Sequence, residues 1–113
     1  MVQEWLQKLK NAWAAHDINA VMALFSDDVE YWETPFVKVA SKEALREEWL
    51  AIHDQTNIDI QTIVYSSDND KFTVLWELHY DRSGQGHHWA GTYLIGLDDK
   101  GICSYFHQTG EKQ

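Results

Sequence analysis

The first half of the chain carries apolar residues at the three-and-four spacing that lines one face of a helix. The first stripe begins at Val2 and continues to Trp13, with polar residues between its members. Asp17 and Ser41 stand where a side chain can cap the free amides at the start of a further helix. The predicted elements are a helix over about residues 2–15, a short helix after Asp17 as far as Phe25, a short strand over residues 29–33, and a helix from Ser41 to about His53.

From Ile58 onward the apolar residues change to a period of two, which is typical of strands. Short segments rich in Ser, Asp, Asn and Gly separate these strands, so neighbouring strands are expected to pair antiparallel. Three helices followed by such strands indicate an α+β fold, in which helices cover one face of a curved sheet and leave a cone-shaped interior. The predicted strands are Ile58–Tyr65, Lys71–Asp81, His87–Leu97 and Ile102–Thr109.

Composition narrows the class of protein. The length of 113 residues fits a single domain over residues 1–113, and a hydrophobic share of 44% excludes a disordered chain. A formal charge of −9 repels phosphate backbones and anionic lipids, so neither nucleic acid nor a membrane is expected as a partner. The chain has one cysteine, no apolar run long enough to cross a bilayer, and no signal-peptide pattern in its first residues, which together predict a cytoplasmic location.

Two parts of the chain resemble a known superfamily. Residues Ala12–Asp17 and Val21–Val29, with a Leu-Phe-Ser-Asp-Asp motif, are similar to the opening of nuclear transport factor 2-like, or SnoaL-like, domains. The turn Asp98–Ile102 and the strand Cys103–His107 resemble that family's last hairpin. The resemblance implies a cone-shaped α+β barrel, with three N-terminal helices packed on a curved, mostly antiparallel sheet. The superfamily includes isomerases, cyclases and non-catalytic proteins, so the fold alone does not fix a function.

Glu33 is the first candidate catalytic residue. In the superfamily's ketosteroid isomerases a catalytic Asp follows the corresponding motif by five residues, and the same count from Asp28 reaches Glu33. Burial near indole rings would raise the pKa of this carboxyl group toward that of a general base, whereas a solvent-facing carboxylate would do no chemistry. The isomerases' two oxyanion donors correspond to Leu9 and approximately Thr92, which cannot replace them, so steroid isomerisation is not expected.

Large aromatic side chains on several elements are predicted to face inward. They can either fill the interior or leave a ligand-sized cavity, and we expect a cavity. Two tyrosines could donate to a ligand oxygen or simply complete the core. The candidate ligand-binding residues are Trp13, Trp32, Trp49, Trp76, Tyr80 and Tyr105.

His107, on the last predicted strand, is the second candidate catalytic residue. Comparison with the isomerases places Cys103, Tyr105 and His107 on the inward face of this strand. An inward imidazole could hydrogen-bond a ligand or relay a proton. It could equally be satisfied by a neighbouring hydroxyl or carbonyl group, and the sequence does not choose between these roles.

Six histidines raise the question of a metal site. His87 and His88 are consecutive on a strand and so point to opposite faces, and the Cys/His spacing of a closed zinc site is missing. A site built from His79, His88 or His107 with an acidic residue is the remaining alternative, since it would be assembled across strands. We predict no metal and no cofactor.

The strand His87–Leu97 carries apolar residues on both faces, which predicts a homodimer whose second copy covers the convex side. The leading hypothesis is a protein that binds a small apolar or aromatic molecule. If it is an enzyme, cofactor-free proton transfer of the isomerase, dehydratase or cyclase type suits a carboxylate and an imidazole in a dry cavity. The alternative is a non-catalytic dimeric binding or scaffolding module with a packed interior.

Overall fold

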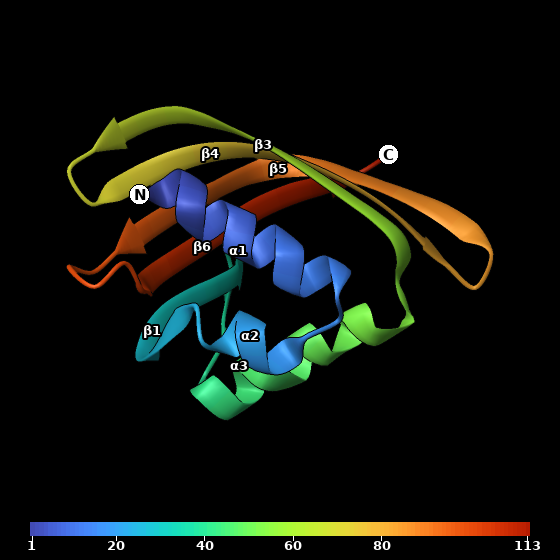
Figure 1. Cartoon of the computed structure of the whole chain (residues 1–113), viewed down its shortest axis with the longest axis horizontal. Coiled ribbons are helices and arrows are strands. Elements are labelled where there is room, and N and C mark those ends of the chain that lie inside the picture. The colour runs from blue at the N-terminus through green and yellow to red at the C-terminus, as the bar shows by residue number, and fades with distance from the viewer.

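The computed structural model describes residues 1–113 and shows helices packed beneath a curved sheet (Figure 1). The chain begins with two helices, continues through two strands and a third helix, and ends with four long strands. The helical elements are α1 (Val2–Ala14), α2 (Ile18–Met22), α3 (Lys42–Trp49) and the 3-10 helix η1 (Leu50–Asp54). The strands are β1 (Phe25–Thr34), β2 (Val37–Lys38), β3 (Thr56–Asp68), β4 (Lys71–Arg82), β5 (Gln85–Leu97) and β6 (Cys103–Lys112).

Both predicted helix caps form. The Asp17 carboxylate accepts a hydrogen bond from the amide of Ala20 at 3.0 Å, and Ser41 Oγ accepts one from the amide of Ala44 at 3.1 Å. The longest helix, α1, has 13 residues, and none of the helices combines the length and apolar character needed to cross a bilayer. The buried stripe of α1 consists of Val2, Trp5, Leu6, Leu9, Ala12 and Trp13.

The sheet has six strands in the order β2-β1-β6-β5-β4-β3. β1 and β6 are parallel, and every other neighbouring pair is antiparallel. The sheet is curved (Figure 1), but it does not close on itself, because β2 and β3 are free edge strands. The helices lie on its concave side (Figure 1), which confirms the predicted α+β architecture.

The second helix is shorter than predicted, and the first strand is longer. α2 ends at Met22, and β1 begins at Phe25 and includes the Ser26-Asp27-Asp28 segment that the sequence predicts as an interruption. The cause is a partner far along the chain. Phe25 pairs with Cys103 of β6, whose amide donates to the carbonyl oxygen of Leu24 at 2.9 Å.

Aromatic side chains fill one end of the interior. The Phe25 ring lies 5.5 Å from the Trp5 ring and 5.7 Å from the Phe106 ring, measured between centroids, and both contacts are edge to face. Trp5 Nε1 also donates to the carbonyl oxygen of Leu24 at 3.0 Å. This end of the interior is closed, so any space for a ligand lies toward the other end of α1.

A β-bulge interrupts β6. Tyr105 is opposite Gly96 of β5, but Cys103 is opposite Leu97, which leaves Ser104 as an extra residue on β6. Because side chains alternate along a strand, one extra residue reverses the face of every residue beyond it.

The bulge overturns the predicted orientation of the last strand. Cys103 and Phe106 are both buried, at 0% and 1% exposure, although they are three residues apart. Gln108 lies on the same concave side as Phe106. The prediction that Tyr105 and His107 face inward is wrong, since both lie beyond the bulge and face the convex side.

Candidate functional site

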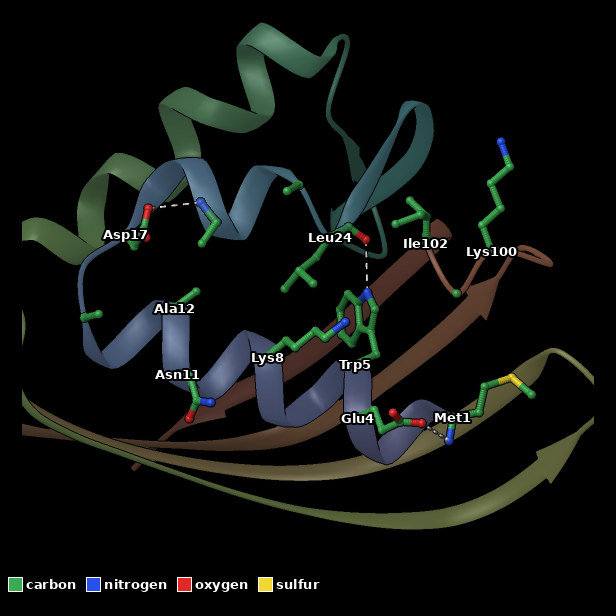
Figure 2. A pocket seen from close by; sticks show the side chains of 14 residues that line it. Met1, Glu4, Trp5, Lys8, Asn11, Ala12, Asp17, Leu24, Lys100 and Ile102 are labelled. Atoms are coloured by element: carbon green, nitrogen blue, oxygen red, sulfur yellow. Dashed lines mark hydrogen bonds and ion pairs between the residues drawn. The ribbon is translucent and has the colours of Figure 1, made fainter.

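The largest groove on the molecule, about 630 Å³, lies between α1, α2 and the turn that joins β5 to β6 (Figure 2). Several of its polar groups are already engaged: Glu4 pairs with the N-terminal amine at 3.4 Å, Trp5 donates to the carbonyl oxygen of Leu24, and Asp17 caps α2 (Figure 2). None of the residues that line the groove has a buried side-chain nitrogen or oxygen atom without a hydrogen-bond partner. We therefore place the candidate site elsewhere.

A cavity of about 160 Å³, termed the inner cavity, lies at the open end of the interior between the helices and the concave side of the sheet. The Trp13 and Trp49 rings meet edge to face in its wall, with centroids 4.9 Å apart at 83°. Tyr31 of β1 stacks on Phe106 of β6 at 4.8 Å. The inner cavity is thus bounded by fixed aromatic rings, several of them in direct contact.

A second hollow of about 380 Å³, termed the outer cavity, adjoins the first and has Trp76 and Trp89 in its wall. The Trp76 indole lies close over the backbone of Gly110, where an added Cβ would come within 2.7 Å of Trp76 Cζ2. Glu33 and Gln108 line both the inner and the outer cavity. These two side chains are therefore the common wall between the cavities.

Glu33 is the titratable group at the centre of this arrangement. Its Oε1 accepts a hydrogen bond from Gln108 Nε2 at 3.1 Å. Burial raises the pKa of the Glu33 carboxyl group, the negative charge of Glu48 raises it further, and the Gln108 hydrogen bond opposes both effects. A carboxyl group with a raised pKa is better matched to proton transfer near neutral pH than an ordinary one.

Two buried phenols share the inner cavity with Glu33. Burial raises the pKa of Tyr31 and of Tyr93 well above the ordinary value, and the Glu33 carboxylate raises both further. Both hydroxyl groups therefore stay protonated at neutral pH. They can act as hydrogen-bond donors there and cannot act as bases.

Of the four tryptophans around the cavities, three are buried, and their indole N–H groups differ in their partners. Trp13 Nε1 donates to Gln55 Oε1 at 2.8 Å. Trp76 Nε1 is buried and has no hydrogen-bond partner in the protein. Trp49 Nε1 is buried beside the Tyr31 hydroxyl group and opposes the rise in the Tyr31 pKa, although the contact does not reach full hydrogen-bond geometry. Buried polar groups are almost always paired, so the Trp76 donor calls for an acceptor that the chain itself does not supply, and the Trp49 donor has room for a better acceptor than the Tyr31 hydroxyl group.

The structure brings some of the sequence-predicted site residues together and separates others. Glu33, Trp13, Trp49 and Trp76 surround the two cavities. Tyr80 is buried but lines neither cavity, because its ring stacks on His87 at 5.0 Å near the far end of β4.

The predicted inward position of Trp32 is wrong, because consecutive strand residues point to opposite faces and Tyr31 and Glu33 occupy the concave side. Trp32 Nε1 instead donates to Glu30 Oε2 at 2.9 Å on the convex side. Its ring lies 6.1 Å from that of His107, which is the convex-side neighbour of Trp32 in the register of β1 and β6.

Sequence reasoning missed Gln108, Tyr31 and Tyr93 as site residues. Tyr31 could have been found from the alternation of β1, because placing Glu33 inward requires Tyr31 inward as well. Gln108 could not, since its face depends on the bulge at Ser104. The inner cavity is lined by two carboxyl groups, Glu33 and Glu48. The cluster of three side chains able to hold a metal lies on the convex face of the sheet.

Comparison with known proteins gives a consistent picture. The sequence profile of the SnoaL-like domain family matches residues 2–105. A search of curated proteins found no match. Among solved structures, RV0760c from Mycobacterium tuberculosis, in complex with estradiol-17beta-hemisuccinate, has a TM-score of 0.76 and 18% identity, over 94% of this chain and 90% of that one.

Two enzymes of known structure are also similar. The epoxide hydrolase/cyclase-like enzyme SalBIII has a TM-score of 0.82 and 11% identity, over 96% of this chain and 89% of that one. A Delta 5-3-ketosteroid isomerase from Mycobacterium sp. has a TM-score of 0.73 and 15% identity, over 99% of this chain and 98% of that one. At these identities the likeness shows the fold and leaves the activity open.

Proposed function

Because this chain belongs to the SnoaL-like domain family, we propose that its inner and outer cavities together bind a small, largely apolar or aromatic molecule that carries a carbonyl or hydroxyl oxygen. The observation that carries the proposal is the unpartnered indole donor Trp76 Nε1, together with the poorly paired Trp49 Nε1, in the walls around Glu33. An apolar ligand body matches the aromatic lining, and its oxygen supplies the missing acceptor.

The two cavities differ in volume, and a ligand would need both. The inner cavity, at about 160 Å³, is smaller than the roughly 300–1,000 Å³ typical of small-molecule sites. The outer cavity, at about 380 Å³, falls within that range and shares Glu33 and Gln108 with the inner one. Rotation of the Gln108 side chain away from Glu33 would join the two spaces and expose the carboxylate to the ligand.

We propose proton transfer as the chemistry of this site. The Glu33 carboxylate takes a proton from the carbon next to a ligand carbonyl, and the C–H electron pair moves into the carbonyl group as an enolate. The hydroxyl groups of Tyr31 and Tyr93 and the Trp49 N–H are the candidate donors to the enolate oxygen. Where a C=C bond is conjugated with the enolate, return of the proton from Glu33 to the far carbon of that bond shifts the double bond, re-forms the carbonyl group and restores the carboxylate, which completes an isomerisation.

The proposed oxyanion donors differ from those of the related isomerases. The positions that correspond to the isomerase donors hold Leu9 and approximately Thr92 here. Tyr31 and Tyr93 come from β1 and β5 and approach Glu33 from the concave side. The steroid ligand of RV0760c and the isomerase activity of the Mycobacterium enzyme support a small apolar ligand as the class to test first.

A second candidate function is a non-catalytic module. The edge-to-face contact of Trp13 with Trp49 and the small inner cavity favour an interior whose main role is packing. In that case the useful surface would be the sheet, and the raised pKa of Glu33 would only reflect its burial.

We also propose that the protein forms a homodimer through the convex side of the sheet. Ile63 and Leu75 are paired across β3 and β4 on this side and are 66% and 40% exposed. Leu94 of β5 is 40% exposed on the same side. Together they form an apolar area that a second copy of the chain could cover.

Ligand binding can be tested by titration of tryptophan fluorescence with estradiol-17beta-hemisuccinate and with 2-naphthol as a smaller probe. Saturable quenching is expected, and Trp49→Phe and Trp76→Phe should each weaken binding by about 5- to 10-fold, because each removes one hydrogen bond while keeping an aromatic ring. Trp32→Phe on the convex side is the matched control and should leave affinity unchanged. Absence of saturable quenching with either probe would favour the packed module.

Catalysis can be tested with 2-tetralone, a ketone whose α-protons exchange with D2O and can be followed by NMR. Glu33→Gln is expected to slow protein-catalysed exchange by about 10²- to 10⁴-fold, the usual contribution of a general base. Glu30→Gln on the convex side of the same strand is the matched control. Equal exchange rates in the wild type and Glu33→Gln would remove the proposed role of Glu33 while leaving ligand binding to be judged by fluorescence.

A further inference from the structure

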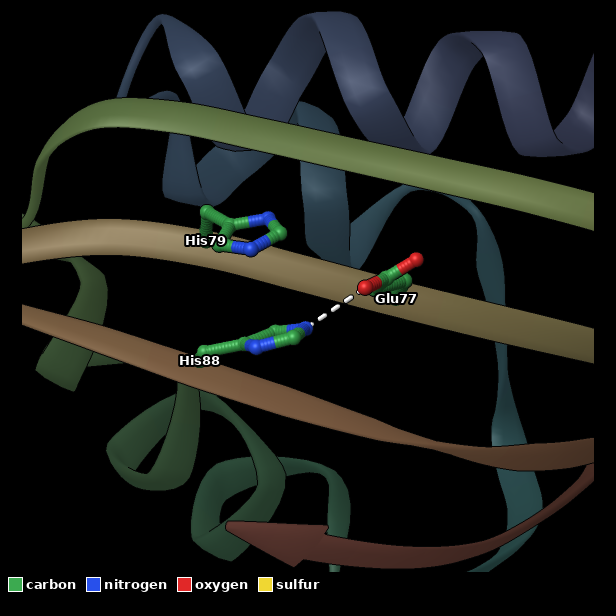
Figure 3. Close-up of side chains that lie close together, drawn as sticks. All are labelled: Glu77, His79 and His88. Atoms are coloured by element: carbon green, nitrogen blue, oxygen red, sulfur yellow. Dashed lines mark hydrogen bonds and ion pairs between the residues drawn. The ribbon is translucent and has the colours of Figure 1, made fainter. Parts of the chain in front are cut away.

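Three potential metal ligands meet on the convex face of the sheet, away from Glu33. Glu77 and His79 lie on β4 and His88 lies on β5, and one ligand atom of each is within 4.8 Å of the others (Figure 3). His88 Nε2 lies 2.6 Å from Glu77 Oε2. The His79 and His88 rings stack with centroids 3.9 Å apart.

The register of the sheet explains this cluster. His79 and His88 are directly paired across the antiparallel strands β4 and β5. Glu77 precedes His79 by two residues and therefore shares its face. The cluster is built on two neighbouring interior strands, and every residue of β4 is paired with β5, which fixes the backbone positions of all three residues.

A fourth residue, which directly follows β6, supports the cluster. The Nδ1 atom of His88 lies 2.6 Å from Gln113 Oε1, and the backbone amide of Gln113 donates to the carbonyl oxygen of His88 at 3.0 Å. Because an amide oxygen accepts a hydrogen bond, Gln113 Oε1 keeps a proton on Nδ1 of His88. Nε2 is then the nitrogen that faces Glu77. This is the arrangement by which outer partners orient metal-binding histidines in proteins.

We propose that Glu77, His79 and His88 bind a divalent first-row transition metal ion, with Zn²⁺ as the reference case. Two imidazoles and one carboxylate form a ligand set that suits such ions and is unsuited to Mg²⁺ or Ca²⁺, which prefer all-oxygen sites. The ion takes the place between Glu77 and His88 that a shared proton occupies without it, so binding releases that proton.

The side chains can reach metal-binding geometry by small rotations. Bonds of roughly 2.0–2.1 Å from zinc to nitrogen place tetrahedral ligands about 3.3 Å apart, closer than the widest separation of 4.8 Å in this cluster. His79 is exposed, and Glu77 and His88 are only partly buried, so their side chains are free to move inward.

Three protein ligands leave at least one coordination position for water. The two histidines also line a depression of about 300 Å³ that is open to solvent, which gives the ion an entry path and room for that water. The site is separate from the inner and outer cavities, since none of its three ligands lines either of them.

The test is isothermal titration of the untagged 113-residue chain with ZnCl2, followed by Co²⁺ substitution and visible spectroscopy. One Zn²⁺ per chain is expected, and Co²⁺ should show the absorption bands of a low-coordinate nitrogen and oxygen site. His79→Ala should weaken Zn²⁺ binding by at least about 10-fold without affecting folding, because its side chain is exposed, and Gln113→Ala should weaken it by about 10-fold through the loss of orientation.

His53→Ala, which removes an exposed histidine from η1, is the control and should leave Zn²⁺ binding unchanged. Thermal unfolding of each variant without metal shows whether a loss of binding reflects loss of the fold. Equal Zn²⁺ affinity in the wild type and in the double variant His79→Ala/His88→Ala would overturn the proposal, as would a wild-type chain that binds Mg²⁺ as tightly as Zn²⁺.

Discussion

Gln108 Nε2 donates to Glu33 Oε1 at 3.1 Å, and the two side chains together form the common wall of the inner and outer cavities. Their strands, β6 and β1, are the parallel pair of the sheet. The same hydrogen bond lowers the pKa of Glu33 and holds the Gln108 side chain between the two cavities. A substitution of Glu33 therefore changes the charge of the site, and a substitution of Gln108 changes the environment of that charge.

Glu33→Gln is expected to stabilise the protein at neutral pH and to have little effect near about pH 4, where an ordinary carboxyl group is largely protonated. The pKa of Glu33 is raised in the folded state, so the folded chain keeps this proton over a pH range in which the unfolded chain has lost it. The stability that Glu33 contributes is complete below its unfolded-state pKa and is lost as the pH rises through its folded-state pKa.

Thermal unfolding of the wild type and Glu33→Gln between about pH 4 and pH 8 measures this effect, with Glu30→Gln as the control for removing one acidic charge. The difference in Tm between Glu33→Gln and the wild type should widen as the pH rises. A difference that narrows with rising pH would show that the Glu33 carboxylate is stabilised in the folded state.

Gln108→Ala is expected to raise the pKa of Glu33 further. The variant removes the hydrogen-bond donor that favours the charged carboxylate, while the burial of Glu33 and the charge of Glu48 are retained. Titration of the Glu33 side-chain carboxyl carbon by ¹³C NMR measures the pKa directly. A lower pKa in Gln108→Ala would mean that water entering the space left by Gln108 hydrates the carboxylate more effectively than the amide does.

Gly110→Ala is expected to destabilise the protein by about 1–3 kcal/mol, the usual cost of forcing extra volume into a packed site. The new Cβ would lie 2.7 Å from Trp76 Cζ2, so the indole has to move. Gly86→Ala is the matched control, because the nearest atom to its Cβ is Asp81 Oδ1 at 3.5 Å, an ordinary contact. Chemical denaturation compares the two variants, and equal stabilities would show that the Trp76 ring moves without cost.

Trp13→Phe is expected to destabilise the protein by about 1–3 kcal/mol more than Trp49→Phe. Both substitutions replace a buried indole with a smaller ring, but only Trp13 Nε1 makes a hydrogen bond of full geometry, to Gln55 Oε1, which would be left buried and unsatisfied. Urea denaturation of both variants under the same conditions measures the difference. Equal losses would indicate that water replaces the Trp13 donor at Gln55.

Leu94→Glu is expected to shift the proposed homodimer to monomers without unfolding the chain. The side chain is 40% exposed on the convex face, and a charge there would have to be buried against a second copy. Light scattering coupled to gel filtration measures the mass, and Val37→Glu, at another exposed apolar position on β2, is the control. A wild-type chain that is monomeric at tens of micromolar would contradict the dimer.

Much of the fold could be predicted from local pattern because helices and hairpins are formed by neighbours in sequence. The caps at Asp17 and Ser41, the helix that ends at Ala14 and the four long strands all follow from residue spacing and turn composition. The strand that begins at Phe25 was missed because its partner, β6, is at the other end of the chain. The predicted cytoplasmic location and the absence of a cofactor stay predictions.

The sequence by itself determined the α+β architecture and the family, since both follow from short-range patterns and motifs, and the resemblance to the family singled out Glu33. Only the tertiary structure decided which aromatic side chains surround Glu33. One extra residue, Ser104, reverses β6, so that Gln108 meets Glu33 while His107 faces the convex side beside Trp32. The face of a strand depends on its register with its neighbours, and register is a property of pairs of distant segments, which no single stretch of sequence contains.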